Sequence, residues 1–136
     1  AKNAYKYIIN TTAELIAIVG QSMSGRYKRQ FLARVFQAIR IEVNDEIAAL
    51  KEMLLSAVEL LKPQGRLVVL SYHSLEDRLV KRFIKTGSFS NEIEKDFYGN
   101  FSVPLKKIGS LICPSSEEIK SNKRSRSAKL RIAEKN

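Results

Sequence analysis

The chain is poor in the residues that build disulfides and metal sites. Among its 136 residues it has one cysteine, Cys113, and one histidine, His73. A single cysteine cannot form an internal disulfide, and one cysteine with one histidine cannot supply the four ligands of a structural zinc site. The composition therefore excludes a disulfide-stabilised fold and a Cys/His zinc fold, and we expect no metal.

Glycine is also scarce, and its placement excludes the common nucleotide-binding loops. None of the six glycines stands two residues from another, and none precedes a Lys-Ser or Lys-Thr pair. The G-x-G and G-K-[ST] patterns of phosphate-cradling loops are therefore absent. The chain has no recognisable nucleotide-cradling loop of its own.

Long hydrophobic runs are missing as well. No apolar run approaches the about 20 residues that a membrane-spanning helix needs, and the first residues show no signal-peptide pattern. We therefore expect a cytoplasmic protein without a membrane partner.

Acidic residues are outnumbered by basic ones, 14 to 24, which gives a net charge of +10. Such an excess attracts polyanions, so nucleic acid is the leading partner class, and a basic but unspecific surface remains the alternative. The basic residues gather in two stretches, Arg26, Lys28, Arg29, Arg34 and Arg40 early in the chain and Lys120, Lys123, Arg124, Arg126, Lys129 and Arg131 late.

Apolar spacing predicts helices in the first half of the chain. Thr11-x-x-Glu14 has the pattern of a capping box and predicts a short helix over about 12–19. From Leu32 to Leu61 apolar residues recur at steps of three and four, which is the period of a helix with one buried stripe. About thirty helical residues would span about 45 Å. Because that length exceeds what one small domain needs, we expect a break near Asn44-Asp45.

The second half predicts strands. The run "GRLVVLSY" at 65–72 shows no alternation, which favours a strand covered on both faces, as in a parallel sheet flanked by helices. The segments 104–112 and 127–135 also read as strands, and they are expected to be antiparallel neighbours. Alternation in the last one indicates a wet face or a sheet edge. Residues 86–103, which precede these two segments, are predicted to form a mobile loop with one helical turn near 91–97.

The stretch "SYHSLEDR" at 71–78 concentrates polar groups directly after the apolar run. Ser74-x-x-Asp77 can cap a helix that stops before Gly87, and the helix dipole then favours the acids of its first turn. This explanation leaves out His73. Side chains just past the carboxyl end of a strand face the ligand crevice of an open α/β sheet, and Ser71 and His73 occupy that place. A reactive site and a simple helix cap both remain open.

Two other chemistries are weaker. A hydrolase built on Ser71 or Ser74 would lack the G-x-S-x-G elbow. A metal-dependent phosphoesterase would need His73, Glu76 and Asp77 on one ion, but neighbouring residues on a helical turn diverge by about 100°. Stabilisation by a divalent ion would reveal such a site, and we expect none.

Three segments together resemble the RsmH (MraW) family, whose members use S-adenosylmethionine to methylate N4 of a cytosine in small-subunit ribosomal RNA. They are "VFQAIRIEVNDEI", "GRLVVLSYHSLEDRLVKRF" and "NKRSRSAKLRIAEK", and the match runs in order from about Thr11 to Lys135. The departures from the family pattern are small: Tyr72, Gln64, Lys123 and Ser125 stand where it usually has Phe, Gly, Pro and Ala.

The resemblance implies the fold and the domain organisation. It implies an α/β protein, the C-terminal part of a Rossmann-like methyltransferase sheet with three strands, preceded by helices of an inserted helical domain. Residues 1–45 would belong to the substrate-recognition insertion and residues 46–136 to the methyltransferase domain. Family members are about twice as long and carry the S-adenosylmethionine loop in the other half. We therefore expect a fragment that is inactive alone.

The resemblance also assigns site residues. His73 and Ser71 are the catalytic candidates at the strand end, and small-subunit ribosomal RNA or the 30S subunit is the partner. For Arg78 a solvated helix charge is an alternative role, and for Arg40 and Asn44 a helix anchor is one. The candidate RNA-binding residues are Arg40, Asn44, Ser74, Arg78, Arg124, Arg126 and Lys129.

A second hypothesis makes the chain a non-catalytic basic RNA-binding module that shares ancestry with this family. A glycine-rich loop upstream in the same reading frame would decide for the enzyme. A strand that lacks its neighbours also exposes an apolar edge, so we predict a dimer or a domain-swapped assembly.

Overall fold

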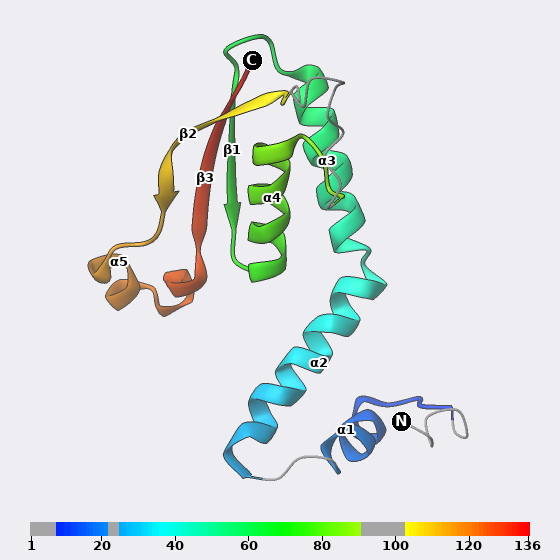
Figure 1. Cartoon of the computed structure of the whole chain (residues 1–136). Coiled ribbons are helices and arrows are strands. Elements are labelled where there is room, and N and C mark those ends of the chain that lie inside the picture. The colour runs from blue at the N-terminus through cyan, green and yellow to red at the C-terminus, as the bar shows by residue number, and fades with distance from the viewer. Residues whose placement is uncertain (1–7, 22–24, 91–102) are drawn as a thin grey trace. The chain divides into compact units, whose positions relative to one another are not determined.

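The computed structural model describes residues 8–21, 25–90 and 103–136 (Figure 1). Two compact units make up the chain, Ala1–Glu46 and Ile47–Asn136. The helical turn expected near 91–97 lies outside the described residues. Among the described residues, no helix has the length and hydrophobicity to cross a membrane.

The described part of the first unit is helical. Thr11 Oγ1 accepts a hydrogen bond from the backbone N–H of Glu14 at 3.2 Å, and the Glu14 carboxylate accepts one from the N–H of Asn10 at 2.9 Å. Two backbone donors at the helix start are thereby satisfied, which confirms the predicted cap. The elements are α1 (Thr12–Gly20), the 3₁₀ turn η1 (Gly25–Tyr27) and α2 (Lys28–Val43).

The predicted break in the long helical segment is confirmed. Asn44 caps the end of α2, with its N–H bonded to the carbonyl of Arg40 at 3.0 Å. Asp45 then takes φ = +51°, a left-handed conformation that stops the helical hydrogen-bond ladder. Helix α3 (Glu46–Leu60) begins at the next residue.

The second unit contains a three-stranded sheet in the order β1-β3-β2. Strand β3 is antiparallel to both neighbours, so β1 and β2 run in the same direction. The three strands and the antiparallel pairing of the last two are as predicted. The elements that follow α3 are β1 (Arg66–Ser71), α4 (Ser74–Thr86), β2 (Leu105–Ile112), α5 (Ser116–Ser121), η2 (Lys123–Ser127) and β3 (Lys129–Lys135).

The core lies on one face of this sheet. Helix α4 packs against all three strands, and α3 adds Leu54 to the same cluster (Figure 1). Burying these side chains supplies the main driving force for folding of the unit, at about 1.5–3 kcal/mol for each large one. The buried apolar residues are Leu54, Val80, Phe83, Ile84, Leu105 and Ala133.

The expectation that the strand after Gly65 is covered on both faces is wrong for the described residues. Leu67 and Val69 pack against the core, but Val68 and Leu70 point the other way and are 56% and 52% exposed. The pairing also differs, because β1 joins β3 in an antiparallel register and lies at the edge of the described sheet.

The pairing differs from the prediction because the last strand, β3, lies between β1 and β2. β3 uses both of its hydrogen-bonding edges, so it is the central strand and not the edge strand that its alternation allowed. Only local periodicity was visible in the sequence, and it does not encode which strand edges meet.

Candidate functional site

The polar stretch after β1 forms the start of α4. The Glu76 carboxylate accepts hydrogen bonds from the backbone N–H groups of Tyr72, at 3.3 Å, and His73, at 3.2 Å. His73 is therefore the N-cap residue, and the predicted Ser74 cap is wrong by one position. The carboxylate of Glu76 reaches the N–H groups just before the helix, which leaves Ser74 exposed as the first helical residue.

His73 combines partial burial with an unused polar atom. Its side chain faces the amide of Glu76 as in a capping box, but the contact does not have the geometry of a hydrogen bond, and Nδ1 is buried with no partner among the described residues. A buried polar atom without a partner costs about 1–3 kcal/mol. Because Nδ1 is buried, a bound molecule could contact it only after the His73 side chain turned outward.

Ser71 lies at the same strand end but is already engaged. Its side chain is buried, and the hydroxyl donates to the carbonyl oxygen of Lys129 on β3 at 3.4 Å. The two residues are paired in the sheet register. The structure thus gives Ser71 a contact within the sheet, and its catalytic role stays a prediction.

Asp77 forms ion pairs with two basic residues of β3. Its carboxylate accepts hydrogen bonds from Arg131 Nε at 2.7 Å and Nη2 at 3.2 Å, and from Lys129 Nζ at 3.2 Å. Burial raises the pKa of Asp77, but the hydrogen bonds and charges of Arg131 and Lys129 outweigh it, so the pKa lies below its ordinary value. Asp77 therefore joins α4 to β3.

This partnership was not predicted from the sequence. Asp77 was explained by the helix dipole alone, and Arg131 was counted only within a basic stretch. The available signal was weak: an arginine inside an alternating strand, where a half-buried charge needs a partner.

Lys129, a predicted RNA contact, has a side chain that is 38% exposed and also binds the Asp77 carboxylate.

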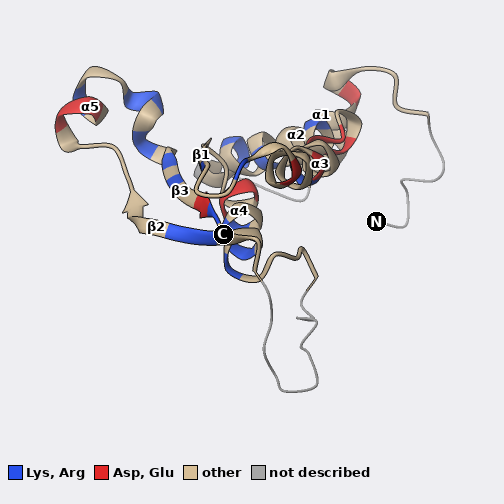
Figure 2. Cartoon of the chain, turned by 90° about the horizontal axis from the view of Figure 1, so that it is seen from above, with Lys and Arg blue, Asp and Glu red and all other residues tan. Residues whose placement is uncertain are grey.

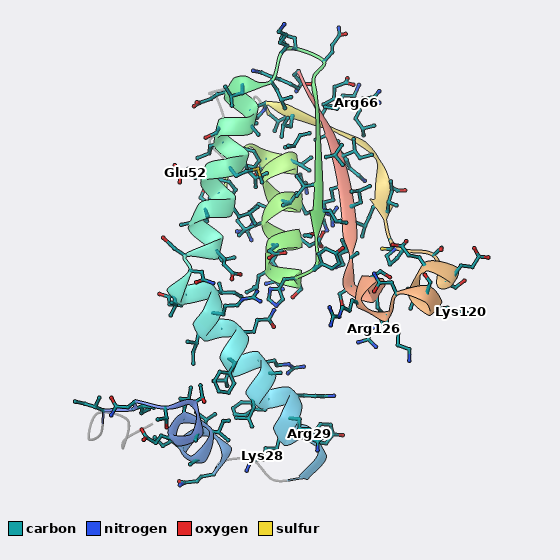
Figure 3. All side chains as sticks on the ribbon, turned by 180° about the vertical axis from the view of Figure 1, so that it is seen from behind. Lys28, Arg29, Glu52, Arg66, Lys120 and Arg126 are labelled. Carbon is teal, nitrogen blue, oxygen red and sulfur yellow. The ribbon has the colours of Figure 1, made fainter. Side chains whose placement is uncertain are left out.

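Two other predicted RNA-binding residues lie on a hydrogen-bonded turn, η2. Ser125 is buried and its hydroxyl donates to the carbonyl of Asn122 at 2.8 Å, while Asn122 Oδ1 accepts from the N–H of Arg124 at 3.1 Å. Arg124 and Arg126, on either side of Ser125, are exposed. Figure 3 shows Arg126 and Lys120 at the same end of the unit.

Arg78 is exposed on α4 and lines a hollow of about 170 Å³ together with Ile47, Leu75, Leu79 and Arg82. Arg82 also donates from Nη1 to the carbonyl of Phe89 at 3.2 Å. The side chain of Arg78 is thus accessible to solvent, which is compatible both with an RNA contact and with a solvated charge.

Arg40 and Asn44 are brought together within the first unit through one carboxylate. Arg40 Nε lies 2.9 Å from Glu46 Oε1, and Asn44 Nδ2 donates to the same oxygen at 3.3 Å. The Arg40 side chain is 60% exposed, so it remains accessible to a ligand. Because Glu46 lies just beyond the helix break, these contacts span the left-handed Asp45.

The metal-dependent phosphoesterase was weighed from the sequence only as a weaker alternative. Glu76 and Asp77 are both engaged with donors, and among the described residues no three His, Cys, Asp or Glu side chains are grouped as metal ligands.

Comparison with known proteins gives a consistent answer. The chain matches the MraW methylase family over residues 1–136. It is 60% identical over 127 residues to the ribosomal RNA small subunit methyltransferase H of Flavobacterium johnsoniae, covering 93% of this chain and 42% of the relative. The protein of that name from Christiangramia forsetii is 56% identical over 127 residues, with the same coverages, and that from Amoebophilus asiaticus is 55% identical over 131 residues, with 96% and 42%.

The chain spans 42% of the length of these curated relatives. The match includes the stretch at 71–78 and the basic turn that carries Arg124 and Arg126. On these grounds the chain belongs to the MraW methylase family.

Proposed function

We propose that this chain is the C-terminal, RNA-facing part of an S-adenosylmethionine-dependent methyltransferase that acts on N4 of a cytosine in small-subunit ribosomal RNA, in the cytoplasm. Residues 1–45 contribute to a helical substrate-recognition insertion, and residues 46–136 complete the methyltransferase domain. The observation that carries the proposal is the match of the whole chain to the MraW methylase family.

The sheet is compatible with a larger Rossmann-like domain. β1 has a free edge among the described residues, and β1 and β2 run in the same direction. Further strands parallel to β1 can pair with that edge, which would give a mixed sheet with one reversed strand. The exposed apolar residues Val68 and Leu70 would then be covered by helices on the second face.

S-adenosylmethionine does not fit the described residues alone. The glycines whose φ is positive, Gly25, Gly87 and Gly109, lie in a turn, at a helix end and within a strand, so none forms a loop from a strand into a helix. Strand β1 leads into helix α4 through two residues, and there the Glu76 carboxylate already accepts hydrogen bonds from the N–H groups of Tyr72 and His73. Binding of S-adenosylmethionine would need residues outside this chain, so we propose that the chain alone is inactive.

His73 is the residue best placed to act on the substrate. An exocyclic cytosine amine is a poor nucleophile because its lone pair is delocalised into the ring, so it must be held in line and its hydrogens must be accepted. His73 Nδ1 has no hydrogen-bond partner among the described residues and lies next to the carboxyl end of β1, and it would meet the cytosine once the ring turned out of its buried position. Ser71, whose hydroxyl donates to Lys129, would support the position of this strand end.

RNA binding would rest on the exposed basic residues. Arg124 and Arg126 are held outward by the buried Ser125, and Arg78 is exposed on α4. Phosphate contacts position an RNA without reading its sequence. In the first unit, Arg40 and Asn44 would contact RNA while they share the Glu46 carboxylate.

The proposal is tested by methyl transfer from radiolabelled S-adenosylmethionine to small-subunit ribosomal RNA and to 30S subunits. The full-length protein should transfer methyl groups to a cytosine, and isothermal titration should show no S-adenosylmethionine binding by this chain alone. Modification of another base, or of no base, would overturn the assignment.

A second candidate is a non-catalytic basic RNA-binding module. The net charge of +10 and the absence of a G-x-G pattern from this chain favour it. RNA binding by the full-length protein without S-adenosylmethionine binding would decide for the module.

A further inference from the structure

We propose that the hollow between α4 and β2 binds one nucleotide of single-stranded RNA, with its phosphates against three lysines and its base or sugar on an apolar floor. The inference rests on the proposed function, which supplies the RNA. It adds an RNA contact on the sheet face, apart from the strand end that carries His73.

The hollow is formed by helix α4 and strands β2 and β3. Its volume is about 260 Å³. Gly109 has φ = +66°, and the register between β2 and β3 shifts between Ile108 and Ile112, so the ladder is irregular next to the hollow. An irregularity of this kind bends the strand and disrupts the ladder locally. The lining residues are Lys81, Ile84, Lys85, Lys107, Ile108, Ser110, Leu111, Arg131 and Ile132.

The rim is strongly basic. Lys81 and Lys85 stand one helical turn apart on α4, and Lys107 reaches the same hollow from β2. Like charges at this spacing repel each other and destabilise a helix. These three lysines form no ion pair within the described part of the chain, whereas Arg131 is paired with Asp77. Figure 2 shows the blue segment of β2 next to α4.

An anion at the rim would relieve this repulsion. Every charged residue of α4 after Asp77 is basic, so the helix itself offers no counter-charge there. Lysine ammonium groups bind phosphate as point charges. The hollow therefore favours a ligand with closely spaced negative groups.

The floor adds a requirement for apolar surface. Ile84, Ile108, Leu111 and Ile132 line the hollow, and the Ser110 hydroxyl offers one polar contact. Unpaired nucleotides can be splayed out of the strand, which exposes the base and sugar next to their phosphates. A single nucleotide combines both features, and the net charge of +10 favours RNA over a weakly charged peptide.

The first experiment compares two double variants of the full-length protein with equal loss of charge. Lys81→Gln/Lys85→Gln removes two rim charges, and Lys62→Gln/Lys106→Gln removes two exposed lysines that do not line the hollow. Binding of a short fluorescent single-stranded RNA is measured from low to high salt. In about 0.1 M salt the rim variant should bind about 20-fold more weakly, and its log-log salt slope should fall by about 1.4 relative to wild type.

The control pair should change the slope by much less. Equal losses in both variants would overturn the proposal, because the contribution of the lysines would then be general charge. Methyl transfer is measured in parallel with a saturating substrate. If methyl transfer is normal and both variants bind RNA equally well, only the proposal about the hollow is refuted. If the wild-type protein transfers no methyl groups, the proposed function itself is refuted.

Methyl NMR of the floor residues identifies the ligand class. Titration with the single-stranded RNA should shift the methyl signals of Ile108 and Leu111, and the rim variant should lose these shifts while keeping the rest of its spectrum. An acidic apolar peptide is titrated as the second probe. Shifts with the peptide and none with RNA would assign the hollow to a protein partner and overturn the proposal.

Discussion

Asp77 and Arg131, 54 residues apart in the sequence, form a hydrogen-bonded ion pair with Nε 2.7 Å from Oδ1. The pair joins the first turn of α4 to the middle of the central strand β3. It links the two sequence segments that resemblance to the family had singled out, the one at 71–78 and the one around Arg131.

We expect this pair to matter for stability. Asp77→Asn leaves Arg131, whose side chain is only 12% exposed, without its charged partner, and should lower the free energy of unfolding by about 3 kcal/mol. Lys129→Gln removes the more exposed partner and should cost less than about 1 kcal/mol. Chemical denaturation of both variants measures the difference, and equal losses would show that Arg131 is not the dominant partner.

The same carboxylate predicts the response to acid. Because the folded-state pKa of Asp77 is lowered, the stabilisation is present above its ordinary pKa of about 4 and is lost as the pH falls through the lower folded-state value. The stability difference between wild type and Asp77→Asn should therefore stay constant between pH 7 and pH 5 and shrink below about pH 4. A difference that already shrinks between pH 7 and pH 5 would mean that the pKa is raised.

His73 should show opposite effects on stability and activity. Asparagine is a better N-cap than histidine, so His73→Asn should stabilise α4 by about 0.5–1 kcal/mol. If Nδ1 contacts the substrate, methyl transfer by the full-length protein should fall by about 100-fold. Thermal melts and methyl transfer are compared with Ser116→Ala, which alters the exposed first residue of α5. Unchanged activity in His73→Asn would leave His73 as a helix cap only.

The basic turn should carry much of the salt dependence of RNA binding. Arg124→Gln/Arg126→Gln should lower the log-log slope for single-stranded RNA by about 1.4. Adding Lys129→Gln should lower it by less than about 0.7, because Lys129 shares the Asp77 carboxylate. Titrations over a range of salt concentrations measure the slopes, and an unchanged slope in the double variant would remove the turn from the interface.

Gln64 is expected to be a strained position. It has φ = +66°, and its N–H donates to the carbonyl of Lys135 at 2.9 Å, which glycine can also do. Gln64→Gly should therefore stabilise the protein by about 0.5 kcal/mol, the left-handed cost of about 1–2 kcal/mol less the entropy cost of glycine. Glu52→Gly, in the middle of α3, should instead cost about 1 kcal/mol. A loss of stability in Gln64→Gly would contradict the argument.

Much of the local structure was predictable from residue spacing. The cap at Thr11, the break at Asn44-Asp45 and the end of α4 at Gly87 each follow from a few neighbouring residues. The cap of α4 was missed by one position because "HSLED" offers two acceptable registers, and only the reach of the Glu76 carboxylate decides between them.

The sequence by itself determined where helices and strands form, where the basic residues gather and which family the chain resembles, because these depend on periodicity, local hydrogen bonds and recognisable segments. The tertiary structure decided the rest: that β3 lies between β1 and β2, that Asp77 meets Arg131, and that three lysines surround one hollow. Those features join residues far apart in the chain, and which strand edges and charges meet is set by how the whole unit packs.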